Sequence, residues 1–245
     1  MRPGGYLGYE LLRIFRNRRY LVLSFGFPLV LYFLIATPNR HEHNFGGSGL
    51  SAPLYYMTGL ASFGAMSAML SAGGRIATER SVGWNRQLRL TPLTTREYFR
   101  TKIVTAYAVA VVSLLLLFLS GSILGVRLSA REWLAMTGLM LVGLIPFGAL
   151  AVLFGHLLSP DSIGPAMGGS VALLAFLGGT WFPITGGGLM AHVAKLLPSY
   201  WLVRASHVAL GGGGWGTQGW LTIAAWTAVL TVLAGRAYRR DTARL

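Results

Sequence analysis

Few residues in this sequence have the types and spacing that catalysis requires. Ser170, in the run GGSVA, could serve as a nucleophile, and His156 or His207 could act as its base. A serine nucleophile needs a base within hydrogen-bonding distance, and nothing in the spacing of these residues places them together. Small residues such as these in an apolar run are more typical of close helix packing. An intramembrane hydrolase is therefore an alternative that the sequence does not favour.

Metal and nucleotide sites are equally poorly supported. The run RHEH at 40–43 offers two histidines and a glutamate, but this spacing in a polar loop is a weak zinc signal. The absence of cysteine excludes thiolate ligands and nucleophiles. No Gly-x4-Gly-Lys-Ser/Thr sequence is present, and the glycines at 211–214 lack the strand and helix of a dinucleotide site. We expect this chain to bind no metal and no cofactor itself.

The composition indicates that most of the chain lies in a membrane. Of 245 residues, 53% are hydrophobic and 11% are charged, whereas soluble domains carry about 25% charged residues. A bilayer-crossing helix needs roughly 20 apolar residues. The expected fold class is an all-α integral membrane protein with six transmembrane helices, forming one domain over 1–245. The six runs are 20–36, 53–76, 103–126, 133–158, 163–184 and 219–238. Pro28 lies inside the first run, and Pro146 interrupts the fourth.

The basic residues predict the orientation of these helices. The net charge is +14, from 21 Lys and Arg against 7 Asp and Glu. Five arginines precede the first run, seven basic residues lie from Arg75 at the end of the second run to Lys102 before the third, and four lie at the C-terminal end. Lys and Arg are concentrated in cytoplasmic loops. Both termini are therefore expected in the cytoplasm. The net positive charge indicates the orientation in the membrane more than binding of a polyanionic ligand.

Two charged segments beside the spans have patterns of their own. Residues 6–19 combine an apolar flank with arginines, which is typical of a helix lying in the membrane interface. The loop 77–102 opens with Glu79-Arg80, Gly83 permits a turn, and the following stretch predicts a short amphipathic helix. Thr91-Pro92 ends it, because a residue before proline is disfavoured in helices. Contact with anionic lipid would explain the arginines of this loop but not its glycine and proline.

This loop resembles the cytoplasmic motif of type-2 ABC transporter permeases, especially the daunorubicin-resistance-type drug and antibiotic exporters. The matching residues are Glu79-Arg80, Gly83, Leu90 and Thr91-Pro92-Leu93. The resemblance implies that the loop forms a coupling helix seated on a separate ATPase subunit. It also implies that 6–19 is the family's interfacial helix. The residues assigned to ATPase coupling are Glu79, Arg80, Gly83, Trp84, Arg86, Leu88, Leu90, Thr91 and Pro92.

The segment 185–212 is similar to the outer-face region of the same family. Pro183 and the glycines at 186–188 break the helix at membrane depth, and residues 189–197 predict a short amphipathic helix. Irregular backbone at that depth must be buried in protein or face water. The resemblance implies short re-entrant helices here, between the fifth and sixth spans.

The resemblance implies a permease subunit of an ATP-driven exporter in the bacterial plasma membrane. It would work as a dimer with itself or a homologous permease, with two ATPase subunits that bind ATP and Mg. Because the spans hold little charge, we expect a hydrophobic or amphipathic substrate such as a drug, antibiotic or lipid, as in multidrug efflux and antibiotic resistance. A lipid-linked glycan is the alternative. The expected path residues are Tyr55, Met57, Phe63, Met167, Phe176, Trp181 and Phe182.

Overall fold

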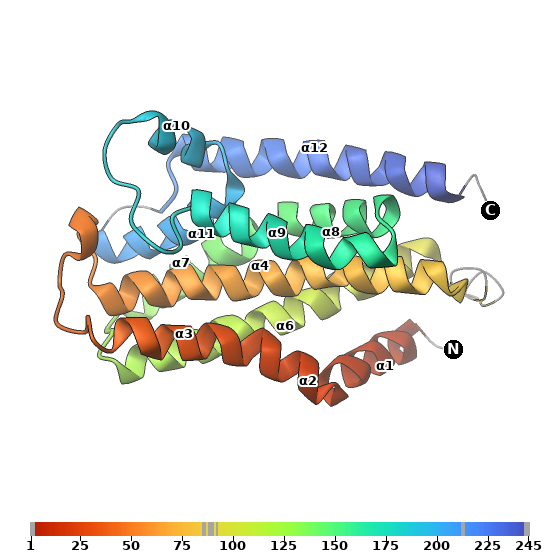
Figure 1. The fold of residues 1–245 in the computed structure, drawn as a ribbon, viewed down its shortest axis with the longest axis horizontal. Helices are drawn as coiled ribbons and strands as arrows, with labels where there is room; N and C mark the ends of the chain where they lie inside the picture. Colours follow the sequence, from red (N-terminus) through yellow and green to blue (C-terminus); the bar gives the residue numbers. More distant parts are fainter. Residues whose placement is uncertain (1–2, 85–86, 88–90, 92, 212–213, 243–245) are drawn as a thin grey trace.

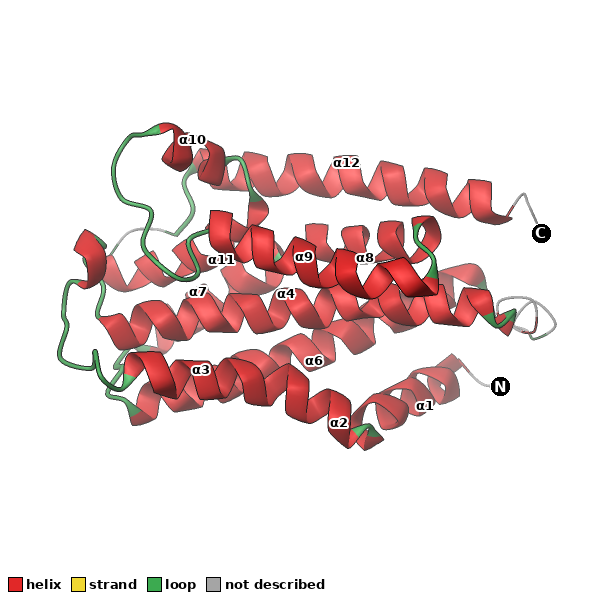
Figure 2. Ribbon diagram, viewed as in Figure 1, coloured by secondary structure: helices red, strands yellow, loops and turns green. Residues whose placement is uncertain are grey.

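A computed structural model describes residues 3–84, 87, 91, 93–211 and 214–242. The long helices run side by side along one axis (Figure 1). Within these described residues the regular structure is entirely helical, without a strand (Figure 2). The start of α1 (Pro3–Arg16), the end of α4 (Ala52–Ser81), the start of α6 (Thr95–Ile123) and the end of α12 (Thr217–Thr242) lie at one end, which we call the basal end (Figure 1). The connections around α10 and α11 lie at the opposite, distal end (Figure 1).

The chain enters the bundle through a bent helical segment. It contains α1 (Pro3–Arg16), α2 (Arg18–Leu21), a π-helical turn η1 (Val22–Gly26) and α3 (Phe27–Ala36). Pro28 lacks an N–H, and its ring opposes the carbonyl of Ser24 one turn earlier. The wider π turn that contains Ser24 accommodates this conflict. The proline that interrupts the first predicted span therefore changes the local helix type without ending the helix.

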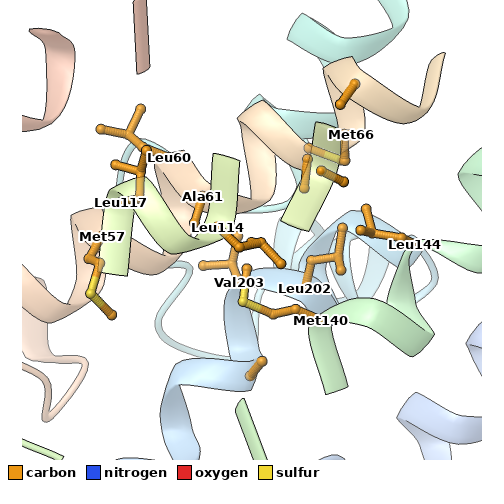
Figure 3. Packing of buried hydrophobic residues seen from close by; sticks show 14 of the residues in the cluster. Met57, Leu60, Ala61, Met66, Leu114, Leu117, Met140, Leu144, Leu202 and Val203 are labelled. Atoms are coloured by element: carbon orange, nitrogen blue, oxygen red, sulfur yellow. The ribbon is translucent and has the colours of Figure 1, made fainter. Parts of the chain in front are cut away.

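The centre of the bundle is α4 (Ala52–Ser81), which packs against α3, α6 (Thr95–Ile123), α8 (Ile145–Leu157) and α9 (Pro160–Leu177). Glycines let these helices approach α4 closely. A Cβ on Gly73 would lie 2.5 Å from the Ala151 carbonyl oxygen, and one on Gly59 would lie 2.7 Å from that of Thr180. Side chains from four helices meet beside it, including Met66 of α4, Leu114 of α6 and Met140 of α7 (Figure 3). This interior is filled by small and apolar residues, and most of α4 is buried within it.

The remaining long helices surround this centre. They are α6 (Thr95–Ile123), α7 (Ala130–Gly143), α8 (Ile145–Leu157), α9 (Pro160–Leu177) and α12 (Thr217–Thr242). Pro146 divides the predicted fourth span, so that α7 ends before Leu144 and α8 begins after it. Shorter elements close the distal end: η2 (Phe45–Gly47), α10 (Leu189–Lys195), α11 (Pro198–Arg204) and η3 (Ala205–Leu210).

Four helical stretches in the described part of the chain are long and apolar enough to cross a membrane. They are Arg18–Ala36, Thr95–Ile123, Ala130–Leu157 and Thr217–Asp241. An all-helical membrane protein is therefore confirmed. The helices α4 and α9, which coincide with the other two predicted spans, are not among the four. For α4 the reason is its content of glycine, serine and threonine, which lowers its hydropathy although it is 30 residues long.

The predicted loop 77–102 is shorter in the structure than the sequence suggests. Helix α4 continues to Ser81, and α6 already begins at Thr95. A capping box fixes that start, because the Thr94 hydroxyl accepts from the Glu97 N–H and the Glu97 carboxylate accepts from the Thr94 N–H. The connection between the two helices is therefore 82–94. Glu79, Tyr98 and Lys102 lie on helices, where their side chains have fixed directions.

Candidate functional site

Glu79 lies in the last two turns of α4 and points into the protein. It is 4% exposed. Its Oε1 lies 2.5 Å from Lys102 Nζ, and its Oε2 accepts a 2.7 Å hydrogen bond from the Tyr98 hydroxyl. Both partners belong to the first two turns of α6, so this carboxylate joins the two helices from which the 82–94 connection emerges.

Helix α1 supplies the rest of this buried charge cluster. Glu10, 1% exposed, places Oε2 3.2 Å from Lys102 Nζ. Arg13 Nη1 lies 3.3 Å from both Glu10 Oε1 and Glu79 Oε1. Two carboxylates thus face two cations, as the cost of burying charge requires. Burial beside these carboxylates also raises the pKa of Tyr6. We call Glu10, Arg13, Glu79, Tyr98 and Lys102 the basal charge cluster.

Arg80, the next residue, binds the other side of the bundle. One guanidinium nitrogen donates to the His156 carbonyl, and Nη2 donates to the Leu158 carbonyl at 2.7 Å. Asp241 near the end of α12 lies 3.5 Å from Arg80 Nη1, and its other oxygen lies 3.0 Å from His156 Nδ1. Arg80 thereby joins the end of α4 to the ends of α8 and α12.

The adjacent residues Glu79 and Arg80 therefore fix the end of α4, from which the 82–94 connection starts, to helices on opposite sides. We call this end of α4, with the residues that bind Glu79 and Arg80, the root of the connection. Glu79 ties α4 to α1 and α6, and Arg80 ties it to α8 and α12. Just beyond this root, Gly83 has a φ of +70°, as the predicted turn requires. Val82 and Trp84 follow the root with exposed side chains, 70% and 38% accessible.

The other predicted coupling residues are less informative. Thr91 is exposed. Arg86, Leu88, Leu90 and Pro92 lie outside the described residues, so the coupling helix stays a prediction. Sequence reasoning missed Glu10, Tyr98, Lys102 and Asp241 as members of the root. One signal was available, because acidic residues are scarce in this chain and Glu10 lies in an otherwise apolar and basic helix.

The seven predicted path residues occupy different environments. Met57 is fully buried and Tyr55 is 3% exposed, with its hydroxyl donating to the Gly179 carbonyl. Phe63 packs partly buried against Trp181, their ring centroids 5.8 Å apart. Met167 lies in van der Waals reach of Gly74, while the exposed rings of Phe176 and Phe182 meet edge to face with centroids 5.2 Å apart. Their role in transport stays a prediction, and in this conformation Met57 has no accessible surface.

The hydrolase alternative gains no geometric support. His156 lies in the last turn of α8 and is bonded to Asp241, whereas His207 lies in η3, between α11 and α12 in the chain. Ser170 of α9 makes no hydrogen bond to either imidazole in the described part of the chain. A nucleophile and base in contact are therefore not seen here. At RHEH, the imidazole of His41 accepts from Arg40 Nε at 2.9 Å.

A helical bundle in which four described stretches are long and apolar enough to cross a membrane is that of an integral membrane protein, and comparison with known proteins identifies its family. Residues 38–236 match the ABC-2 family transporter protein. The chain belongs to this family, and it is a type-2 ABC permease. It is 29% identical over 198 residues to a protein of Bacillus subtilis (strain 168) named "Putative transport permease YvfS", a match covering 78% of each chain.

Proposed function

We propose that this chain is the membrane subunit of an ATP-driven exporter that moves a hydrophobic or amphipathic solute out of the cell. ATP is bound and hydrolysed by separate ATPase subunits. Six helices cross the bacterial plasma membrane, the four apolar stretches together with α4 and α9. Support for α4 comes from its length, since 30 residues extend about 45 Å and the hydrocarbon core is about 30 Å thick.

The basal end faces the cytoplasm in this proposal. The start of α1, the end of α12 and the ends of α4 and α6 that flank the 82–94 connection share that end (Figure 1), and the arginine-rich segments of the sequence belong to or adjoin them. The positive-inside tendency then favours one orientation for the whole bundle. The exposed side chains of Val82 and Trp84 would face a cytoplasmic partner.

The observation that carries the coupling mechanism is the root formed by Glu79 and Arg80. A force on 82–94 can move the bundle only if the end of α4 and the start of α6, which flank this connection, do not bend separately. The Glu79–Lys102 contact joins these two helix ends. Glu10 and Arg13 connect them to α1, and Arg80 connects them to α8 and α12. Displacement of the ATPase-bound connection would therefore move the bundle as a unit. Glu79 acts as a positioning residue, since its carboxylate is satisfied inside the subunit.

Coexpression with an ABC ATPase encoded beside the gene tests this function. Trp84→Ala should weaken assembly and reduce transport while lowering the unfolding temperature of the isolated permease only slightly, because the side chain is partly exposed. Gly83→Pro should likewise weaken assembly and reduce transport, since proline cannot adopt a φ of +70°. Trp220→Ala, at an exposed tryptophan of the distal end, is the matched control. Assembly and transport equal to wild type in both basal variants would contradict the coupling assignment.

Two copies of the subunit are proposed to enclose the solute path. The exposed pair Phe176 and Phe182 offers an apolar surface, and Gly168 and Gly169 of α9 have open space around them within one subunit. Glycines of this kind allow close helix approach. The cysteine-free chain permits a direct test: Gly168→Cys should crosslink between copies on oxidation in membranes. The control is Leu134→Cys, at an exposed position of α7. If this control crosslinks and Gly168→Cys does not, the interface between copies lies elsewhere.

A further inference from the structure

A pocket of about 390 Å3 lies between the α1–α2 bend, the basal half of α4, and α9. Its polar surface comes from α4 and the bend, while Ile14 and Met167 add apolar surface. None of the seven acidic residues of the chain lines it. The lining residues are Arg13, Ile14, Asn17, Tyr20, Ser71, Gly74, Arg75, Thr78 and Met167.

Arg75 lines this pocket, and two of its three guanidinium nitrogens donate no hydrogen bond. Its Nη1 donates to the Ser71 hydroxyl at 3.2 Å, but Nε and Nη2 are inaccessible and have no partner among the described residues. The neighbouring hydroxyls are already engaged, with Tyr20 bonded to Ser71 and Thr78 bonded to the Gly74 carbonyl. A guanidinium held this way has two unused donor nitrogens, and a turn of its side chain toward the pocket would offer them to a planar or tetrahedral anion.

The charge of Arg75 is also uncompensated. In the basal charge cluster one turn below, the carboxylates of Glu10 and Glu79 are already balanced by Lys102 and Arg13. In the described structure Arg75 itself forms no ion pair. A partly buried, unpaired cation beside a membrane is costly and in such proteins commonly marks a ligand site.

The depth of Arg75 matches that of lipid headgroups. It lies six residues before the end of α4, which corresponds to about 9 Å along the axis. Because α4 exceeds the hydrocarbon thickness by about 15 Å, this position falls near the inner boundary of the apolar layer. Met167 and Ile14 can contact a chain that continues from the headgroup into that layer.

We propose that this pocket binds the anionic headgroup of an amphiphile, a phosphate or carboxylate, with Arg75 as its main contact. This inference extends the proposed function. Only the statement that the amphiphile is exported rests on that function. A second pocket, of about 330 Å3 at the distal end, is lined by Lys195, Arg204 and His207 and by no acidic residue. A cationic pocket at each end of the bundle suits an anionic solute that enters at one and leaves by the other.

Binding is tested on the purified permease alone, in nanodiscs of phosphatidylcholine, so that no result depends on an ATPase. The probe is dodecyl phosphate, and dodecylphosphocholine is the matched probe whose charge is neutralised. Wild type should bind dodecyl phosphate about tenfold or more tightly than Arg75→Gln, which is the size expected for losing hydrogen bonds to a charged group. Arg75→Lys should fall between them. Arg19→Gln, at an exposed arginine of α2, should bind like wild type.

A steric pair of variants tests the pocket without touching its charge. A Cβ at Gly74 meets only Met167 side-chain atoms at 3.5–3.6 Å, so Gly74→Ala should fold and bind normally, whereas Gly74→Leu should block the probe. Equal binding by wild type and Arg75→Gln overturns the proposal, and so does equal affinity for the two probes. It is likewise overturned if Gly74→Leu binds like Gly74→Ala.

The source of the headgroup is distinguished in two further arms. In nanodiscs with phosphatidylglycerol, two results together identify a resident lipid. Dodecyl phosphate no longer binds, and wild type but not Arg75→Gln retains phosphatidylglycerol. Persistent binding, with stimulation of ATP hydrolysis in the ATPase complex, identifies a transported solute. Both results support the anion site. If the complex with the ATPase does not form but dodecyl phosphate still binds, the result contradicts the proposed function and supports the anion site.

Discussion

Replacing Lys102 by methionine should destabilise the subunit more than any other single change in the basal charge cluster. The ammonium group is completely inaccessible and lies 2.5 Å from Glu79 Oε1 and 3.2 Å from Glu10 Oε2. Methionine has a similar length and no charge, so packing is largely kept. Two buried carboxylates would then share one remaining cation, Arg13, whose side chain is 49% exposed.

The size of the effect follows from this burial. Removing one partner of a buried ion pair costs about 3–5 kcal/mol, whereas removing a half-exposed partner costs about 0–1 kcal/mol. For a chain of 150–250 residues each kcal/mol lowers the unfolding temperature by about 2–4 °C. Lys102→Met should therefore lower it by about 6–20 °C, and Arg13→Gln by no more than about 4 °C.

Tryptophan fluorescence during heating of the detergent-solubilised permease measures both variants. The double variant Glu79→Gln/Lys102→Met should recover at least half of the loss, because buried pairs replaced together leave less unpaired charge. If Lys102→Met unfolds at the same temperature as Arg13→Gln, the buried cluster does not stabilise this end of the bundle. The positioning role of Glu79 would then lose its physical basis.

Three further predictions follow from individual contacts. Arg80→Lys should lower the unfolding temperature almost as much as Arg80→Ala, since an ammonium cannot reach both carbonyls and Asp241 as the guanidinium does; full rescue by lysine would show that charge alone suffices. Gly73→Ala should destabilise through its 2.5 Å approach to a carbonyl oxygen, while Gly138→Ala, with open space around it, should not; equal unfolding temperatures would refute the close packing. Ser81→Cys should react with a membrane-impermeant maleimide from the cytoplasmic side of intact membranes and His43→Cys from the outside, and the reverse pattern would invert the topology.

Much of the fold could be predicted from local sequence. Continuous apolar runs determined the all-helical membrane class, because backbone groups in hydrocarbon must be paired within a helix. Pro28 and Pro146 marked the two places where regular helix is interrupted, and Gly83 marked a turn. The type-2 ABC permease family was also recognisable from the sequence motif. Each of these features depends on residues close together along the chain.

The direction in which Glu79 and Arg80 point was decided by tertiary structure. The sequence pattern placed Glu79 and Arg80 on a surface loop, where charged residues are usually solvated. In the fold, Glu79 is buried because Lys102, Tyr98 and Glu10 come from α6 and α1 to meet it, and Arg80 turns toward α8 and α12. A charge can leave water only when counter-charges and hydrogen bonds replace the solvent. Those partners lie far away in the sequence, so only the packed bundle could determine which charges face inward.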